Sequence, residues 1–200
     1  MKILRDDRLL WFLNRGTGVV LLVLLTLAVA LGVLATVRAS SRWWPRFVTQ
    51  ALHRNISLLA VALLVAHIST AIMDDYVDLR WYDGVAPFVA HYRPFWLGLG
   101  TVALDLIVLA AVTSLARNRF GLRQWRAVHL TTYPAWALGL IHGLGIGTDQ
   151  RTTWSVATTA SCVGVVAVAG AVRLATTTHA PEVIDLRSAR PRTHSASRRY

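Results

Sequence analysis

Five long apolar stretches dominate this chain, and they restrict its fold more than any other feature of the sequence. A stretch of about 20 mostly apolar residues is long enough to cross the roughly 30 Å hydrocarbon core of a bilayer as a helix. The five stretches run roughly over residues 16–37, 47–73, 95–116, 125–145 and 154–175. They predict an all-α integral membrane protein, built as a five-helix transmembrane bundle.

The composition agrees with a lipid bilayer as the surroundings of the chain. Hydrophobic residues make up 54% of the 200 residues and charged residues only 16%, against about 25% in a typical soluble domain. The net charge of +11 would usually suggest nucleic acid. Here the arginines lie between the apolar stretches, so cytoplasmic arginines beside a membrane explain the charge, and no nucleic-acid partner is expected.

The loops between the stretches differ in charge, and the difference predicts the orientation. The first and third loops carry several arginines and no acid, and the tail after the fifth stretch is also rich in arginine. The second loop is acidic, with Asp74, Asp75, Asp78 and Asp83. Because cytoplasmic loops are the basic ones, we expect a multi-pass protein of the cell membrane with an external N-terminus and a cytoplasmic C-terminus.

These stretches also divide the chain. Residues 1–15 are expected to form an N-terminal segment and residues 16–175 the membrane domain. Residues 176–200 are polar and rich in Arg, Ser, Thr and Pro, which predicts a disordered basic cytoplasmic tail. We expect no flavin or nicotinamide domain in these segments, and no GxGxxG motif follows a predicted strand.

Four histidines lie inside apolar stretches, where ionisable side chains are costly and point to function. His53 and His67 occupy the second stretch, and His129 and His142 the fourth, at spacings of 14 and 13 positions. One helix separates these two helices, so they should run parallel. His53 then lies level with His129 and His67 with His142, in two facing pairs about 20 Å apart.

On an ideal helix, the two spacings place their histidines at different angles around the helix axis. Fourteen positions return a side chain to within about 40° of its starting face, so His53 and His67 share a face. Thirteen positions leave His129 and His142 about 140° apart on an ideal helix. We therefore expect the fourth helix to be distorted, and Pro134 between these histidines is a ready cause.

Facing imidazoles suit haem iron better than the other metals that histidine binds. Neutral imidazole binds zinc, copper or haem iron, but zinc normally takes four ligands that include Cys or carboxylate. A porphyrin already supplies four nitrogens, so two axial histidines complete the iron and leave no position for oxygen or a substrate. We expect two b-type haems, between the second and fourth helices, that serve electron transfer.

Three further charged residues have candidate roles. Arg54 adjoins His53, and Arg93 precedes the third stretch; each is a candidate partner of haem propionates, or else an arginine at the membrane interface. Asp105 lies inside the third stretch, where it could be hydrogen-bonded to a threonine, paired with an arginine or part of a proton path. Structural pairing is the expectation for Asp105.

The chain resembles the ferric-reductase-like transmembrane domain, which also forms the membrane half of NADPH oxidases. The resemblance covers roughly residues 11–175. It rests on His53-x13-His67, on His129-x12-His142, and on the strings LHRNISLL, YRPFWLGLG, AVTSLARNR and WRAVHLTTYPAWALGLIHGLGIGTD. These strings look similar to small bacterial stand-alone members that have no reductase domain.

The resemblance implies an oxidoreductase component that carries electrons across the membrane through two haems. The flavin and NADPH domain of the large members is not matched, so a separate electron donor, a flavoprotein or a quinol, is expected. Three other functions stay open: a quinol-linked haem subunit that feeds an extracytoplasmic reductase, as in the methionine sulfoxide repair system; a histidine-lined membrane transporter or metal permease; and a non-catalytic membrane scaffold.

Overall fold

A computed structural model describes residues 7–37, 45–74 and 79–178, and within these ranges the chain forms helices and no strand. The α-helices are α1 (Asp7–Thr36), α2 (Arg46–Met73), α3 (Pro94–Leu115), α4 (Leu122–His129), α5 (Thr132–Ile146) and α6 (Thr153–Thr178), with short 3-10 helices η2 (Trp81–Gly84) and η3 (Arg117–Arg119). By length and composition, α1, α2, α3 and α6 could each cross a membrane. The predicted all-α class is therefore confirmed.

The first helix begins at Asp7, whereas the sequence predicts a start at Gly16. Its apolar span extends from Leu9 to Thr36. Arg15 interrupts the apolar pattern, but the structure pairs its guanidinium with the carboxylate of Asp149. Arginine is a good helix former, so the helix continues through this position and extends about two turns before the predicted start.

The fourth predicted stretch is not one helix, since it is divided between α4 and α5. At the break the backbone N–H of Thr131 bonds to the carbonyl of Val128 at 3.0 Å, three residues back instead of four. Pro134 lacks an N–H, and its ring clashes with the carbonyl four residues earlier, that of Leu130. The predicted distortion is confirmed, and α5, with 15 residues, is short for a span.

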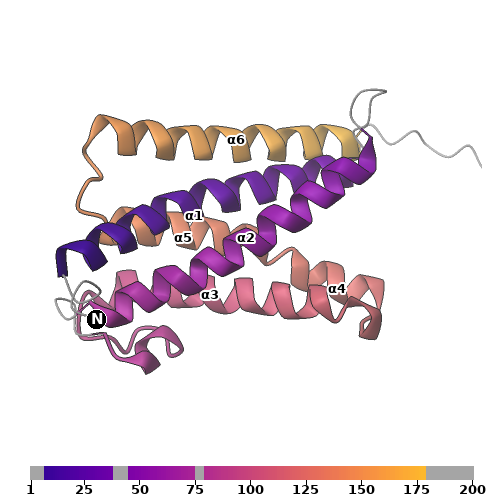
Figure 1. The fold of residues 1–200 in the computed structure, drawn as a ribbon. Coiled ribbons are helices and arrows are strands. Elements are labelled where there is room, and N and C mark those ends of the chain that lie inside the picture. The colour runs from indigo at the N-terminus through magenta and orange to yellow at the C-terminus, as the bar shows by residue number, and fades with distance from the viewer. Residues whose placement is uncertain (1–6, 38–44, 75–78, 179–200) are drawn as a thin grey trace, which may run out of the picture.

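The helices form two groups, α1 with α2 and α6, and α3 with α4 and α5, and α6 runs in the same direction as α1 (Figure 1). α1 and α2 pack along each other, α3 packs against α5, and α6 lies along α1 (Figure 1). α4 and α5 together carry the chain from the end of α3 back to the start of α6 (Figure 1). The apolar core contains Leu21, Ala60 and Leu64, with Leu104 and Ile107 of α3 packed against it.

Some predictions concern residues outside the described ranges. Residues 38–44 include Arg38 and Arg42 of the first basic loop, and residues 75–78 include two of the acids of the second loop. The predicted tail is described only at 176–178, where α6 continues. The orientation in the membrane therefore stays a prediction.

Candidate functional site: two histidine pairs

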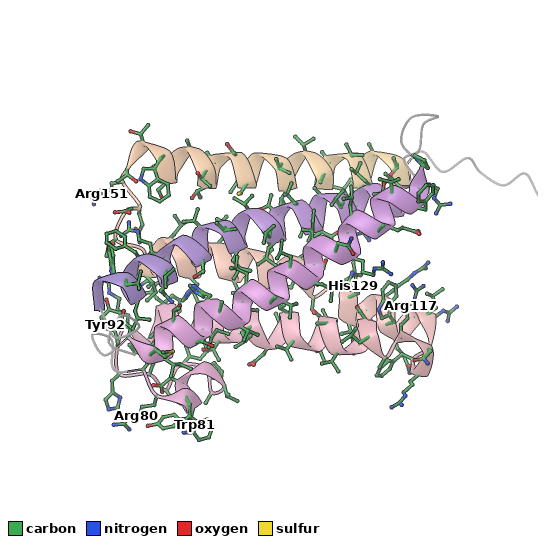
Figure 2. The ribbon with its side chains drawn as sticks, viewed as in Figure 1. Arg80, Trp81, Tyr92, Arg117, His129 and Arg151 are labelled. Carbon is green, nitrogen blue, oxygen red and sulfur yellow. The ribbon has the colours of Figure 1, made fainter. Side chains whose placement is uncertain are left out.

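The structure brings the four histidines of the apolar stretches together in two pairs. The rings of His53 and His129 face each other with centroids 6.1 Å apart and planes at 77°. His67 and His142, near the other ends of α2 and α5, are close enough to interact electrostatically. Figure 2 shows His129 toward the end of the bundle that carries Arg117. The pairing expected from helix register is thus present.

Three of these histidines are fixed in the same way, by a backbone carbonyl of a neighbouring helix. Their Nδ1 atoms donate as follows: His53 to Ala28 (2.9 Å), His67 to Asn14 (3.0 Å) and His142 to Trp96 (2.8 Å). A carbonyl oxygen only accepts, so the proton of each neutral ring is on Nδ1 and the lone pair is on Nε2. Histidines that bind metals usually hold their second nitrogen by such a bond.

A side-chain hydroxyl and an indole hold the fourth histidine. His129 Nδ1 lies 3.4 Å from Ser114 Oγ, which also accepts the indole N–H of Trp125 at 3.3 Å. The Trp125 ring stacks on His129 with centroids 4.9 Å apart. The guanidinium of Arg117 lies over the Trp125 ring, 4.4 Å from its centroid. His129 is therefore oriented by a surface layer, whereas the other three rings are oriented by helix backbones.

Each histidine that is bonded to a carbonyl also lies against a glycine. A Cβ added to Gly18 would lie 3.2 Å from His67, one at Gly32 would lie 3.3 Å from His53, and one at Gly100 would lie 2.6 Å from His142. In all three cases the glycine follows the accepting residue by four positions: Asn14 and Gly18, Ala28 and Gly32, Trp96 and Gly100. Residue i+4 sits one turn above carbonyl i, so a missing side chain there opens that carbonyl to the imidazole.

The sequence carried a signal for these glycines that the histidine spacing alone did not reveal. Gly18 and Gly32 are 14 positions apart, like His53 and His67. Because α1 and α2 are antiparallel, equal spacings keep both contacts in register. On α3, Gly100 and Ser114 repeat the 14-residue spacing opposite the two histidines of α4 and α5.

Close packing between α3 and α5 is reciprocal. The ring of His142 on α5 lies against Gly100, and the ring of Trp96 on α3 lies against Gly145, where an added Cβ would come within 2.0 Å of it. Midway along the bundle, the Trp136 indole donates to Thr26 Oγ1 at 2.9 Å and ties α5 to α1. The glycine contacts thus set the distance between α3 and α5, and the Trp136 bond joins that pair to α1.

The two candidate arginines lie beside different histidine pairs. Arg54 is exposed next to His53. Arg93 is exposed at the start of α3, and its guanidinium donates to the carbonyl of Gly145 at 2.7 Å, three positions beyond His142. Both positions agree with the ends of the bundle expected from the sequence, and their roles toward propionates stay predictions.

Asp105 does not have the internal partner that the sequence suggested. Its side chain is exposed on α3. Among the described residues, no hydrogen bond or ion pair involves it. The expected pairing with a threonine or an arginine of the same chain is therefore not found in this part of the structure.

The chemistry of the donor set limits what the pairs could bind. Within the described ranges, no group of three or more His, Cys, Asp or Glu side chains could hold a metal ion. The separation of His53 and His129, 6.1 Å between centroids, is about that of two imidazoles on one metal with bonds of about 2 Å. The distance between His53 and His129 would therefore allow both rings to reach one metal ion, and such an ion would need its other ligands from outside these residues.

Substituting Gly100 by alanine should destabilise the protein by about 1–3 kcal/mol, because the new methyl group overlaps His142. Gly164 on α6 is the matched control, since an added Cβ there meets nothing within 4 Å. Alanine favours a helix more than glycine does, and this gain in stability is the same at both positions. The difference in stability between the two variants therefore measures the clash of the new methyl group with His142. Thermal unfolding in detergent measures it, and equal midpoints for the two variants would contradict the packing described here.

Comparison with known proteins matches the chain to a protein family. A family model described as "Domain of unknown function (DUF8596)" matches residues 9–149, a range that contains all four paired histidines. No curated protein and no solved structure matches the chain.

Proposed function

Since the chain belongs to DUF8596, a family described as a domain of unknown function, we propose its function from the two histidine pairs. We propose a di-haem b-type membrane protein that carries electrons across the bilayer as a ferric reductase-like oxidoreductase component. The observation that carries this proposal is the shared geometry of His53, His67 and His142. Each has Nδ1 bonded to a backbone carbonyl, which leaves Nε2 as the ligand atom.

The four histidines would serve as axial ligands, His53 with His129 and His67 with His142. A bis-histidine haem supplies a one-electron centre whose iron has no free position for a substrate. The carbonyl bonds hold the imidazoles in one tautomer and orientation, so no ring has to turn or exchange a proton before it binds. The glycines beside the rings let each imidazole approach a helix backbone, which limits its movement.

The placement of the pairs supports transfer across the membrane. One pair lies toward each end of α2, 14 positions or about 21 Å apart along the helix. Between them lie the apolar side chains of Leu21, Ala60 and Leu64, which keep water out of the middle of the bundle. Two redox sites separated by dry protein suit electron transfer and would oppose passage of ions.

In this proposal the protein works in a lipid bilayer and receives its electrons from a separate donor. We propose that the protein lies in the cell membrane and that α4 and α5 together form the fourth of five crossings. Exposed arginines cluster beside the His53 pair at the end expected to be cytoplasmic: Arg117, Arg119, Arg123 and Arg126. Their charge would suit an acidic flavoprotein as donor, and a quinol is the alternative.

Proteoliposomes test the electron transfer directly. Haem-loaded protein should pass electrons from dithionite outside the vesicles to ferricyanide trapped inside, and the ferricyanide absorbance should fall much faster than in empty vesicles. The His53→Ala variant should show a rate near that of empty vesicles, because the path lacks one of its two sites. A variant that transfers electrons at the normal rate would contradict the assignment of His53.

A further inference from the structure

Asp105 occupies an unusual place for a carboxyl group. α3 contains 22 residues, which rise about 33 Å and match the hydrocarbon thickness of a bilayer. Asp105 lies near the middle of this helix, and its side chain is too short to reach either interface from there. A carboxyl group at this depth needs a hydrogen-bonding partner, and the described residues provide none.

The same face of α3 continues as an apolar stripe. Val108, Leu109 and Val112 are 47%, 46% and 56% exposed, and with Asp105 they follow the spacing i, i+3, i+4, i+7 of one helical face. The described residues therefore leave this face of α3 exposed from the centre of the helix toward its C-terminal end.

The other half of this face is covered by the chain itself. Toward the start of α3, the Thr101 hydroxyl donates to the carbonyl of Asp83 in η2 at 3.1 Å. Phe88 lies on Gly98, where an added Cβ would come within 2.2 Å of its ring. The exposed stripe from Asp105 to Val112 thus begins where the segment that contains η2 and Phe88 stops covering α3.

We propose that this stripe is an interface with a second copy of the chain, in which two Asp105 side chains hydrogen-bond as neutral carboxylic acids. Copies in one membrane share an orientation, so a two-fold axis along the membrane normal places the same residue of each copy at the same depth. A carboxylic acid both donates and accepts and is complementary to itself. The arginines of the spanning helices cannot serve instead, because even the most central of them, Arg15, Arg54 and Arg173, lie away from the middle of their helices.

Disulfide cross-linking of the full chain in lipid-diluted liposomes tests the interface. Val112→Cys, two turns from Asp105 on the stripe, should give covalent dimers under mild oxidation. Leu59→Cys is the control, because it lies at mid-helix on α2 and is equally exposed, at 57%, but off the stripe. Cys162 is buried and stays in both variants.

Substitution of Asp105 tests the hydrogen bond itself. Asp105→Leu should raise the dimer dissociation constant roughly tenfold, since an interhelical hydrogen bond in a membrane contributes up to about that factor. Asp105→Asn should keep the dimer, because an amide also hydrogen-bonds to a second amide. This variant is the control for a folding defect, since it also removes the carboxyl group. The proposal is independent of the haem sites. Two results would overturn the proposal. One is a monomeric wild-type protein in liposomes, which would mean that Asp105 pairs with a cationic partner other than a second copy. The other is cross-linking through Val112→Cys that the added Asp105→Leu change leaves unchanged.

Discussion

Replacing His53 by alanine should halve the haem content of the purified protein, from two haems per chain to one. The lost imidazole is half of one axial pair, and the other pair, His67 with His142, stays complete. The His129→Ala variant should give the same result, because His129 completes the same site. Haem per chain, from the absorbance of the extracted pyridine complex, is the measurement.

Double variants make this prediction specific to the pairing. His53→Ala with His129→Ala should still hold one haem, since both changes fall in one site, whereas His53→Ala with His67→Ala should hold none. Such non-additivity is the signature of residues that act in one unit. His91→Ala is the control, because His91 is exposed in the segment before α3 and should not affect haem. The pairing would be refuted by one haem in the second double variant.

Reporter fusions should place the C-terminus after Tyr200 in the cytoplasm and the acidic loop near Asp78 outside the cell. Cytoplasmic loops are rich in arginine, and the loop around Asn118 has Arg117, Arg119 and Arg123 with no acid. A reporter at Asn118 should therefore read cytoplasmic. The reason is the charge of the loops alone, so the result does not depend on haem.

A reporter at Gln150 tests whether α4 and α5 cross the membrane together. This loop lies at the same end of the bundle as the start of α1 (Figure 1), so it should read external. The Asn118 reporter is its control, since the two flank the split helix. A cytoplasmic reading at both positions would show that α4 and α5 do not cross the membrane, which would leave four spans instead of five.

The sequence predicted well those features that depend on local chemistry. Apolar length gave α2, α3 and α6 to within a few residues, because backbone groups in lipid must bond within their own helix. The 13-residue spacing and Pro134 predicted the break between α4 and α5. The predicted start of α1 at Gly16 was wrong, since the helix begins at Asp7 and runs through Arg15, which breaks the apolar pattern but favours helix. The partner of Arg15, Asp149, is more than a hundred residues away and could not be predicted.

Features that depend on pairing between helices were not predictable in the same way. The carbonyls of Asn14, Ala28 and Trp96 carry no sequence signal, since every residue has one. They matter only because antiparallel packing brings a histidine to each of them. The glycines one turn later could have been found by their 14-residue spacing, but only with the knowledge that α1 packs against α2.

The difference spectrum of the purified, haem-supplied chain tests the central claim most directly. The dithionite-reduced minus oxidised spectrum should show a low-spin b-type haem, and the haem count should be two per chain, because four histidines provide two complete axial sets. A histidine-lined transporter or a scaffold would show no such bands. A chain that folds and holds no haem, or only one, would contradict the account.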